Sequence, residues 1–365
     1  MVWLLAFVFV AGAAAQAQWE MQKSGTTADL RGIDNVGGGV AWASGTNGTV
    51  LRTEDGGYLW QTCAIPPGAE HLDFRGIQAF DTNTAIVMSS GKGDLSRMYK
   101  TTDGCQTWTL VFTNPDSPEG FFNCFWLHRT GYGILLGDPV KNRFALFETT
   151  DGGKTWKRDK RSGLLIKGKP IAAFAASNSL FSQTPSGYMR GFVTGGSGGA
   201  FFFEAFRSRQ WSRTPIPLES GTESSGVFSL GFRFTLPRCT DCEHPSDYFL
   251  VAVGGDYTKP DASSGTAAMS TDLGETWLPA QTLPHGYRSA VAYDGDAKAW
   301  ITVGPNGTDI STDDGKNWRA LHPDPAMHEA PDADRDWNAL SLPFVVGPHG
   351  RIGKLNSHAL APVGH

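Results

Sequence analysis

One eight-residue pattern recurs along this chain, and it constrains the fold more than any other feature. The pattern is Ser/Thr-x-Asp-x-Gly-x-x-Trp, and its copies end at Trp60, Trp108, Trp156, Trp277 and Trp318. The second copy carries Cys105 at the glycine position, and a degenerate copy, FEAFRSRQW, ends at Trp211 without the aspartate or the glycine. Six units therefore follow one another, with their tryptophans 41 to 66 residues apart.

Each copy has the chemistry of a hairpin turn. An aspartate side chain accepts backbone N–H bonds across a turn, and glycine adopts the left-handed backbone that the turn requires. The tryptophan then buries about 150–250 Å² against a neighbouring unit. We therefore interpret the aspartates of the complete copies as structural, not catalytic or metal-binding: Asp55, Asp103, Asp151, Asp272 and Asp313.

Each unit also contains four short segments with strand character. In the first unit these are LRGIDNV, GVAWASG, TVLRT and LWQTC, and no window of the chain keeps the 3.6-residue period of a helix. Repeats of this length with four strands are typical of a β-propeller.

The two ends of the chain complete the pattern. Residues 337–356 supply three strands without a fourth, whereas residues 18–22 (QWEMQ) supply an isolated strand with Trp19 in the position of the repeated tryptophan. Pairing them would remove the exposed edges of an open ring. The sequence thus predicts an all-β protein: a single domain over residues 18–365, a seven-bladed β-propeller with four-stranded antiparallel blades, closed by the N-terminal strand.

The N-terminal segment indicates export. Residues 1–17 (MVWLLAFVFVAGAAAQA) contain an apolar run followed by an A-x-A site, although a positive N-terminal region is missing. The apolar run is far shorter than the roughly 20 residues of a membrane span. We expect a signal peptide that is cleaved near Ala17, and a secreted or periplasmic, monomeric mature chain without a membrane span.

Charge and cysteine content narrow the range of partners. The net charge is -5 and the basic residues are dispersed, so no nucleic-acid partner is predicted.

An odd count of five cysteines leaves at least one unpaired in an exported chain. Cys239 and Cys242 are expected to form a local disulfide, because a zinc site would need a second pair and only His244 is close; the pairing of Cys63, Cys105 and Cys124 stays open. We expect no metal and no cofactor.

Candidate ligand-binding residues gather on one face of the predicted ring. In a propeller the Asp turns share a face with the loops between the first and second strands, and the opposite face holds the starts of the inner strands and the loops between the second and third strands. Polar side chains at those positions would converge on the channel mouth. They are Arg31, Arg75, Asn123, Asp138, Asp256, Tyr257, Lys259, Arg288 and Asn338.

The repeated turn resembles the Asp box of bacterial neuraminidase repeats. The segment LRGIDNVGGGVAWASGTNGTVLRTEDGGYLW (30–60) is similar to the photosystem II stability and assembly factors, and the resemblance covers nearly all residues after the first 17. It implies a propeller that docks a partner polypeptide and performs no chemistry. Because Asp boxes also occur in sialidases and xyloglucanases, a glycan remains a second class of ligand.

A glycosidase is the alternative. In a sialidase-like site, Arg31, Arg75 and Arg288 would hold a substrate carboxylate, Tyr257 would be the nucleophile, and Asp138 or Asp256 the acid. Against this, the Arg-Ile-Pro signature of sialidases is absent and no glutamate is expected at the mouth to activate Tyr257. A xyloglucanase-like carboxylate pair is also possible, but those enzymes use two propellers. The sequence therefore favours binding without catalysis and leaves enzymatic activity open.

Overall fold

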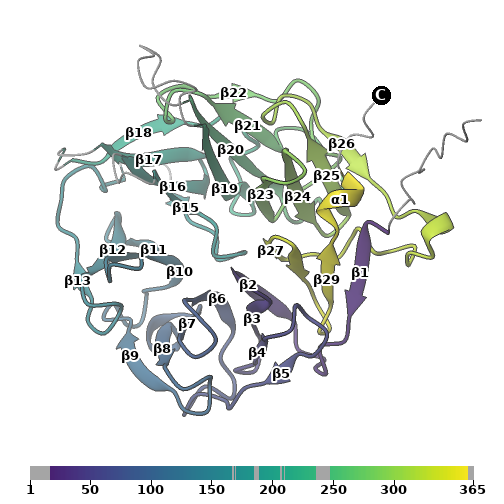
Figure 1. Ribbon diagram of the computed structural model, residues 1–365. Coiled ribbons are helices and arrows are strands. Elements are labelled where there is room, and N and C mark those ends of the chain that lie inside the picture. Colours follow the sequence, from purple (N-terminus) through teal and green to yellow (C-terminus); the bar gives the residue numbers. More distant parts are fainter. Residues whose placement is uncertain are drawn as a thin grey trace, which may run out of the picture.

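A computed structural model of the protein describes residues 17–166, 168, 170–184, 189–205, 208, 210–235 and 247–360. Within these residues the helical elements are two single-turn 3-10 helices and one short α-helix: η1 (Gly93–Leu95), η2 (Pro325–Met327) and α1 (Ser357–Leu360). The remaining elements are strands in antiparallel sheets, which stand around a common centre (Figure 1). The all-β prediction is confirmed. None of the described helices is long and apolar enough to cross a membrane.

Five of the sheets have four strands each. In chain order, the first three comprise β2 (Leu30–Gly37), β3 (Val40–Gly45), β4 (Val50–Thr53) and β5 (Gln61–Thr62); β6 (Phe74–Ala79), β7 (Ala85–Ser89), β8 (Arg97–Thr101) and β9 (Thr109–Thr113); and β10 (Phe122–Leu127), β11 (Gly133–Val140), β12 (Arg143–Thr149) and β13 (Lys157–Arg158). A fourth comprises β23 (Ala290–Asp294), β24 (Ala299–Gly304), β25 (Gly307–Ser311) and β26 (Arg319–Leu321).

The fifth four-stranded sheet joins the two ends of the described chain. It has the order β1-β29-β28-β27, and its strands are β1 (Trp19–Gln22), β27 (Ala339–Ser341), β28 (Phe344–Val346) and β29 (Ile352–Leu355). Trp19 pairs with Leu355 and Gln22 with Ile352. The N-terminal strand therefore pairs with β29, at the outer edge of the C-terminal sheet.

The remaining sheet has nine strands, in two groups. One group contains β14 (Ile171–Ala172), β15 (Phe181–Gln183), β16 (Met189–Gly196), β17 (Ala200–Ala205) and β18 (Ser212–Pro215); the other contains β19 (Ser225–Thr235), β20 (Asp247–Asp256), β21 (Ala267–Ser270) and β22 (Leu278–Pro279). Gly195 of β16 and Gly226 of β19 form the one residue pair that joins the groups. Because neither glycine has a side chain, the two backbones approach closely enough to pair.

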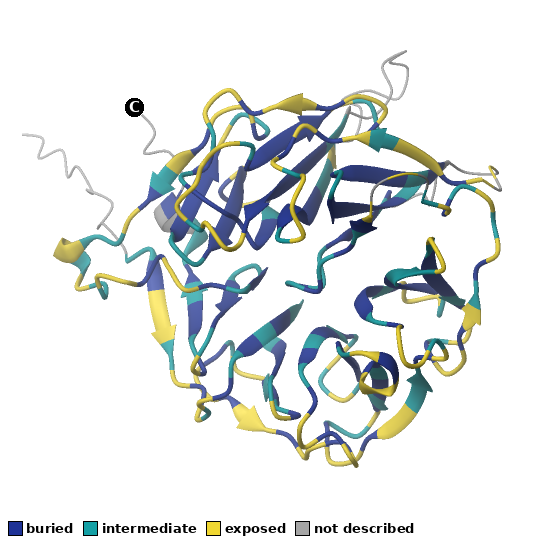
Figure 2. Cartoon of the chain, turned by 180° about the vertical axis from the view of Figure 1, so that it is seen from behind, coloured by how far each residue is buried: buried dark blue, intermediate teal, exposed yellow. Residues whose placement is uncertain are grey.

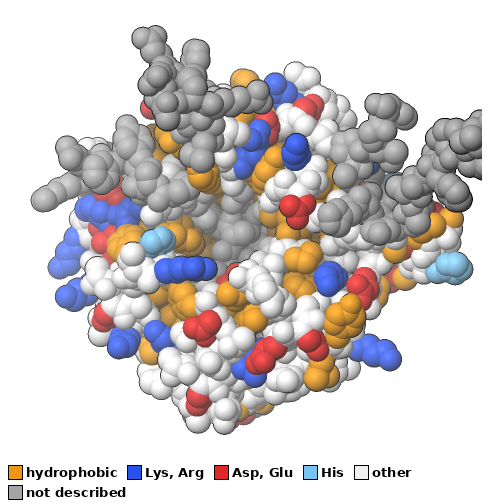
Figure 3. All heavy atoms as spheres, in the orientation of Figure 1, with side chains coloured by type: hydrophobic (Ala, Val, Ile, Leu, Met, Phe, Trp, Pro, Cys, Tyr) orange, Lys and Arg blue, Asp and Glu red, His pale blue; other side chains and the backbone are white. Residues whose placement is uncertain are grey.

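The hydrophobic core lies between neighbouring sheets, and the rim strands are the more exposed part of the ring (Figure 2). The strands nearest the centre include β2, β6, β10, β19, β23 and β27 (Figure 1). Trp156, for example, packs in one cluster with Ile86 and Met98 of the preceding sheet. The repeated tryptophans, Trp19 and Trp211 included, are between 2% and 8% exposed, which confirms that they act as buried anchors. Acidic and basic side chains are intermingled on the surface seen from the side of Figure 1 (Figure 3), in keeping with the small net charge.

The Asp turns have the predicted hydrogen bonds. In the third turn, Thr149 Oγ1 and the Thr155 N–H donate to Asp151 Oδ1 at 2.8 and 2.9 Å, and Thr155 Oγ1 donates to Oδ2 at 2.6 Å. These bonds, led by the Thr155 hydroxyl, lower the pKa of Asp151. The other four complete turns repeat the hydroxyl and backbone bonds to their aspartates: Asp55, Asp103, Asp272 and Asp313.

Replacing Asp151 should therefore destabilise the fold without affecting ligand binding. Asp151→Ala leaves the Thr155 N–H and two hydroxyls without their acceptor, and we expect the free energy of unfolding to fall by roughly 1–2 kcal/mol in this exposed turn. Urea unfolding measures the loss. The matched control is Glu275→Ala, an exposed carboxylate in another Asp turn, which should change stability by less than about 0.5 kcal/mol. Equal stability of the two variants would contradict a structural role for Asp151.

The cysteines form a link that the sequence did not predict. Cys63, which follows β5, is bonded to Cys105 in the turn between β8 and β9, so the disulfide joins two neighbouring sheets. Cys105 has a left-handed backbone with φ of 65°, the conformation that glycine supplies in the other turns. Cys124 is buried and free, and burial raises its pKa to about 12. The disulfide predicted between Cys239 and Cys242 lies outside the described residues, as does the predicted signal peptide of residues 1–17 except for Ala17.

Candidate functional site

A cavity of about 600 Å³ opens where the inner strands begin. Six of the nine predicted ligand-binding residues line it: Arg31, Arg75, Asn123, Asp138, Tyr257 and Asn338. The predicted face therefore carries a concave polar site, and its remaining walls include aromatic side chains that the sequence did not single out.

β-Bulges turn several of these side chains toward the cavity. The pairing of β2 with β3 shifts between Leu30 and Gly32, so Arg31 is an extra residue without a partner on β3. The same shift leaves Arg75 unpaired on β6, Asn123 on β10 and Phe228 on β19. A bulge bends the strand and re-aims its side chain. All four bulge residues line the cavity, and this shared irregularity positions the site.

The two arginines have free hydrogen-bonding capacity. Arg75 Nε donates to Asp73 Oδ2 at 2.7 Å and its Nη1 donates to the Ala175 carbonyl at 3.1 Å, which leaves Nη2 for a ligand. Arg31 contacts Asp73 and Asp29 only at ion-pair distances of 3.4 and 3.8 Å. Both arginine side chains are about 30% exposed. They can therefore bind an anionic group such as a carboxylate in bidentate geometry.

Asp138 is held in place by neutral donors. Its Oδ1 accepts a hydrogen bond from Asn123 Nδ2 at 2.9 Å and another from the Ala173 N–H at 3.2 Å. Burial raises the pKa of Asp138 above its ordinary value. This carboxyl group can thus accept hydrogen bonds from a ligand or, when protonated, donate one.

Aromatic side chains form another part of the cavity wall. The rings of Phe174 and Phe228 are stacked at 4.0 Å between centroids, and the edge of Tyr287 packs on Phe228 at 4.8 Å. Burial raises the pKa of Tyr287, so its phenol stays neutral. Phe174 and Phe228 are apolar, so a pattern of polar side chains at the mouth does not reveal them in the sequence. The position of Phe228, equivalent to Arg31 at the start of an inner strand, would have identified it.

Tyr257 is the most exposed member of the site. Its side chain is 52% exposed, its ring contacts Phe228 edge-on at 6.1 Å, and within the described chain its hydroxyl makes no hydrogen bond. Glu223 also lines the cavity, contrary to the expectation that no glutamate would lie there. No hydrogen bond connects Glu223 to Tyr257 in the described part of the structure. The Tyr257 hydroxyl is therefore not hydrogen-bonded to this carboxylate, although both residues line the same cavity.

Arg288 does not line the cavity, which corrects its predicted role. The N–H groups of Leu30, Arg288 and Trp337 each donate to a glycine carbonyl of the preceding sheet, so these three residues are equivalent. Ser289, not Arg288, therefore takes the position of Arg31 and Asn338. A slip of one residue in a strand turns a side chain to the opposite side, and Ser289 lines the cavity in place of the arginine.

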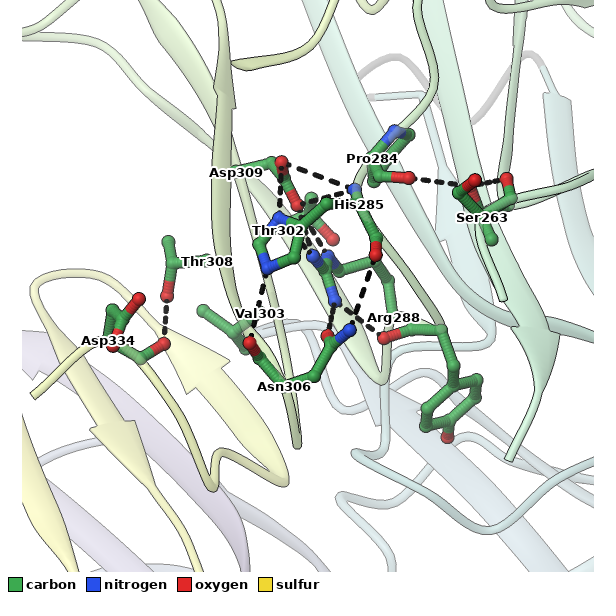
Figure 4. A network of polar contacts seen from close by, with 12 residues as sticks. Ser263, Pro284, His285, Arg288, Thr302, Val303, Asn306, Thr308, Asp309 and Asp334 are labelled. Carbon is green, nitrogen blue, oxygen red and sulfur yellow. Dashed lines mark hydrogen bonds and ion pairs between the residues drawn. The ribbon is translucent and has the colours of Figure 1, made fainter. Parts of the chain in front are cut away.

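The Arg288 side chain is instead completely buried in a polar network (Figure 4). Its Nε donates to Asp309 Oδ2 at 2.7 Å, and its Nη1 donates to Asn306 Oδ1 and the Tyr287 carbonyl at 2.6 and 2.7 Å. Burial lowers the pKa of Arg288 while Asp309 opposes that shift. Arg288 is therefore unavailable to a ligand and supports the loops behind the site.

Asp256 and Lys259 also lie off the cavity wall. Asp256 is buried, and Thr258 donates to its Oδ1 through the hydroxyl at 2.7 Å and the backbone N–H at 3.0 Å. These bonds, with the hydroxyl contributing most, lower the pKa of Asp256 to about 2. The Lys259 side chain is mostly exposed, and its Nζ lies 3.4 Å from Asp256 Oδ2. An ionised carboxylate with these partners is a structural turn residue and not a proton donor.

Across the described residues, no group of three or more His, Cys, Asp or Glu side chains could hold a metal ion.

Solved structures resemble this fold. YCF48 bound to D1 peptide has 19% sequence identity, with 93% of this chain and 96% of that chain covered and a TM-score of 0.59. YCF48 from Cyanidioschyzon merolae also has 19% identity, with 94% and 100% covered and a TM-score of 0.57. The GH74 xyloglucanase from Xanthomonas campestris has 13% identity, with 95% of this chain but 54% of the enzyme covered and a TM-score of 0.62.

Sequence comparison identifies the family. A search of curated proteins found no match. Residues 11–332, however, match the family model described as Photosynthesis system II assembly factor YCF48. That match spans well over half of the chain, and it agrees with the resemblance drawn from the repeated turns. The protein belongs to the YCF48 family of photosystem II assembly factors.

Proposed function

We propose that this chain is an exported, non-catalytic seven-bladed propeller that docks a partner polypeptide in the cavity formed by the inner-strand starts. The observation that carries the proposal is that one cavity is lined both by arginines with unused hydrogen-bond donors and by stacked aromatic rings. Arg31 and Arg75 offer donors for a carboxylate, while Phe174 and Phe228 offer an apolar surface. Arginine and aromatic residues are the types most often found as anchors of protein interfaces.

The division of the sheets supports the seven-bladed arrangement. The nine-stranded sheet splits naturally at its single glycine–glycine pair into β14–β18 and β19–β22, which gives seven units in all. In this proposal β1 closes the ring by completing the unit of β27–β29. We further propose that residues 18–365 form one monomeric domain, exported after cleavage of residues 1–17.

A polypeptide partner is favoured over a glycan. The structure of YCF48 bound to D1 peptide shows that a member of this family binds a peptide, although at 19% identity the bound sequence does not transfer to this chain. The alternative, a glycosidase at the same cavity, would need a base beside Tyr257 or a pair of carboxylates flanking a bond. The described residues place no hydrogen-bonded base on Tyr257, and they remove Asp256 and Arg288 from the cavity.

The arginines should dominate peptide affinity. The probes are peptides with an apolar residue before a free C-terminal carboxylate, their C-terminal amides, and a D1 peptide. We expect Arg31→Ala and Arg75→Ala each to weaken binding of the free-acid peptides by about 10- to 100-fold, the effect of losing a hydrogen bond to a charged group. Isothermal titration calorimetry measures the change. Lys259→Ala, a cation that lies off the cavity wall, is the matched control and should bind like the wild type.

Glycan turnover is the outcome that would overturn this proposal. Purified protein would be incubated with sialosides and xyloglucan, alongside Tyr257→Phe and Asp138→Asn. Hydrolysis that either substitution abolishes would establish the glycosidase. Equal affinity of the arginine variants and the Lys259 control for every peptide would equally reject the docking site.

A further inference from the structure

A repeated hydrogen bond ties neighbouring inner strands together further along the channel. In three sheets, the side chain three residues after the one that lines the Arg31 cavity accepts a hydrogen bond from a backbone N–H of the next sheet. The bonds run from the Ala79 N–H to Asp34 Oδ2 at 2.7 Å, from the Leu127 N–H to Gln78 Oε1 at 2.8 Å, and from the Asn35 N–H to Ser341 Oγ at 2.9 Å. A carboxylate, an amide and a hydroxyl all perform the same structural task. A neutral side chain is therefore sufficient for it.

The negative charge of Asp34 thus exceeds what the fold requires. Within the described chain, Asp34 has no ion pair, and its Oδ1 accepts no hydrogen bond from another residue. Burial raises the pKa of Asp34 to about 6, against the opposing effect of the Ala79 N–H. The buried charge of Asp34 costs the fold stability, and neutral side chains make the same hydrogen bond in other sheets. Charges of this kind are typical of functional sites.

Asp34 faces two adjoining cavities on the side of the channel away from the Arg31 cavity. The first, which we call the inner cavity, has a volume of about 270 Å³ and is lined by Asp34, Trp126 and neutral side chains from several inner strands. The second, the outer cavity, has a volume of about 300 Å³; it shares Asp34 and Trp126 and adds His128 and Arg129. His128 and Arg129 are thus the other charged or titratable groups on these two walls. The inner cavity has none besides Asp34.

From this geometry we infer a second binding site, for a primary ammonium or guanidinium group, between Asp34 and Trp126 in the inner cavity. The free carboxylate oxygen supplies an ion pair, and the face of a tryptophan ring attracts cations. The cation lies in the inner cavity because Arg129 repels it from the outer one. The apolar residues Ile33, Ile77 and Leu340 on the same wall accommodate the methylene chain of such a ligand.

The test compares a cation with its neutral isostere. The probes are Nα-acetyl-arginine methylamide, the citrulline equivalent, free agmatine, and a pentapeptide with a central arginine. Calorimetry at pH 7.5 should show millimolar or tighter binding of the cations and at least tenfold weaker binding of citrulline. If only agmatine binds, the natural ligand is a free small cation. If the pentapeptide binds more tightly, the natural ligand is a basic side chain of a partner polypeptide.

Two variants separate the charge from the fold. Asp34→Asn keeps an acceptor for the Ala79 N–H and should weaken cation binding at least tenfold, while peptide binding at Arg31 and Arg75 stays unchanged. In the wild type, cation affinity should fall as the pH is lowered through about 6. Because protonation of His128 acts in the same direction, the titration is repeated with His128→Asn, which should retain the fall. Absence of millimolar binding, equal binding of citrulline, or full affinity in Asp34→Asn would each overturn the inference.

Discussion

Removing the disulfide between Cys63 and Cys105 is expected to lower the free energy of unfolding by about 4 kcal/mol. The cross-link closes a loop with a sequence separation of 42 residues, and the chain-entropy relation gives a value of this size for such a loop. The variant to make is Cys63→Ala with Cys105→Gly, because Cys105 has the left-handed backbone that glycine adopts in the other Asp turns. Urea unfolding, compared with the wild type, measures the loss.

Reduction provides the control for this prediction. The comparison is made in a Cys239→Ser, Cys242→Ser background, because those two cysteines are expected to form a second disulfide. In that background a reducing agent should destabilise the protein by a similar amount and leave the Cys63→Ala, Cys105→Gly variant unchanged, since Cys124 is free and buried. If the reduced and oxidised forms unfolded at the same urea concentration, the bond between the first two sheets would contribute nothing. Disulfides persist in oxidising compartments, so a strong dependence on this bond also fits the proposed export.

Asp34→Asn is expected to raise the free energy of unfolding by about 1–3 kcal/mol at pH 7 and above. Burial raises the pKa of Asp34 from 3.8 to about 6 in the folded state, and each unit corresponds to 1.36 kcal/mol. We expect less than the full conversion because the side chain is partly exposed. Most substitutions destabilise a protein, so a gain here would be specific evidence of a charge that the fold tolerates at a cost.

The sign of this effect depends on pH. Below pH 3.8 Asp34 is protonated in both states and contributes no difference between the two proteins. Between pH 3.8 and about 6 the unfolded chain releases the proton while the folded chain keeps it, so the wild type loses stability relative to Asp34→Asn. Above about 6 the difference is constant. Thermal unfolding across this range checks the prediction, and a variant that is less stable than the wild type at pH 7 would contradict it.

The two inferred sites would prefer ligands of opposite charge at two different positions along the channel. Arg31 and Arg75 favour an anionic group at the inner-strand starts, and Asp34 favours a cation further along the same strands. Arg31 and Asp34 lie three residues apart on β2, as Arg75 and Gln78 do on β6. One inner-strand repeat therefore supplies both sites, and the difference between Asp34 and Gln78 decides where the negative charge lies.

The architecture could be predicted from the sequence because its signals are local. A turn needs an acceptor, a glycine and an anchor within eight residues, and the tryptophan spacing then fixes the repeat length. The structure agrees with the predicted strands of the first unit, with the burial of Trp211 and with the pairing of β1 and β29. Each follows from short-range chemistry combined with repetition.

The site could be predicted only in part. Arg31, Arg75 and Asn123 line the cavity because each follows the first residue of its inner strand, a position that repetition reveals. Arg288 was misplaced because strand register depends on hydrogen bonds to the neighbouring sheet, and a slip of one residue reverses the side chain. Phe174 and Glu223 reach the cavity from segments outside the repeat, so no periodic signal marks them.

The sequence by itself therefore determined the repeated unit, the all-β class and the face on which the polar cavity opens. Only the tertiary structure decided which side chains meet there, that Cys63 pairs with Cys105, and that Asp34 carries an unpaired charge. The physical reason is the range of the interactions involved. Turn hydrogen bonds and hydrophobic alternation act between residues close in the chain, whereas register, disulfide pairing and burial of a charge depend on neighbours that folding brings from distant segments.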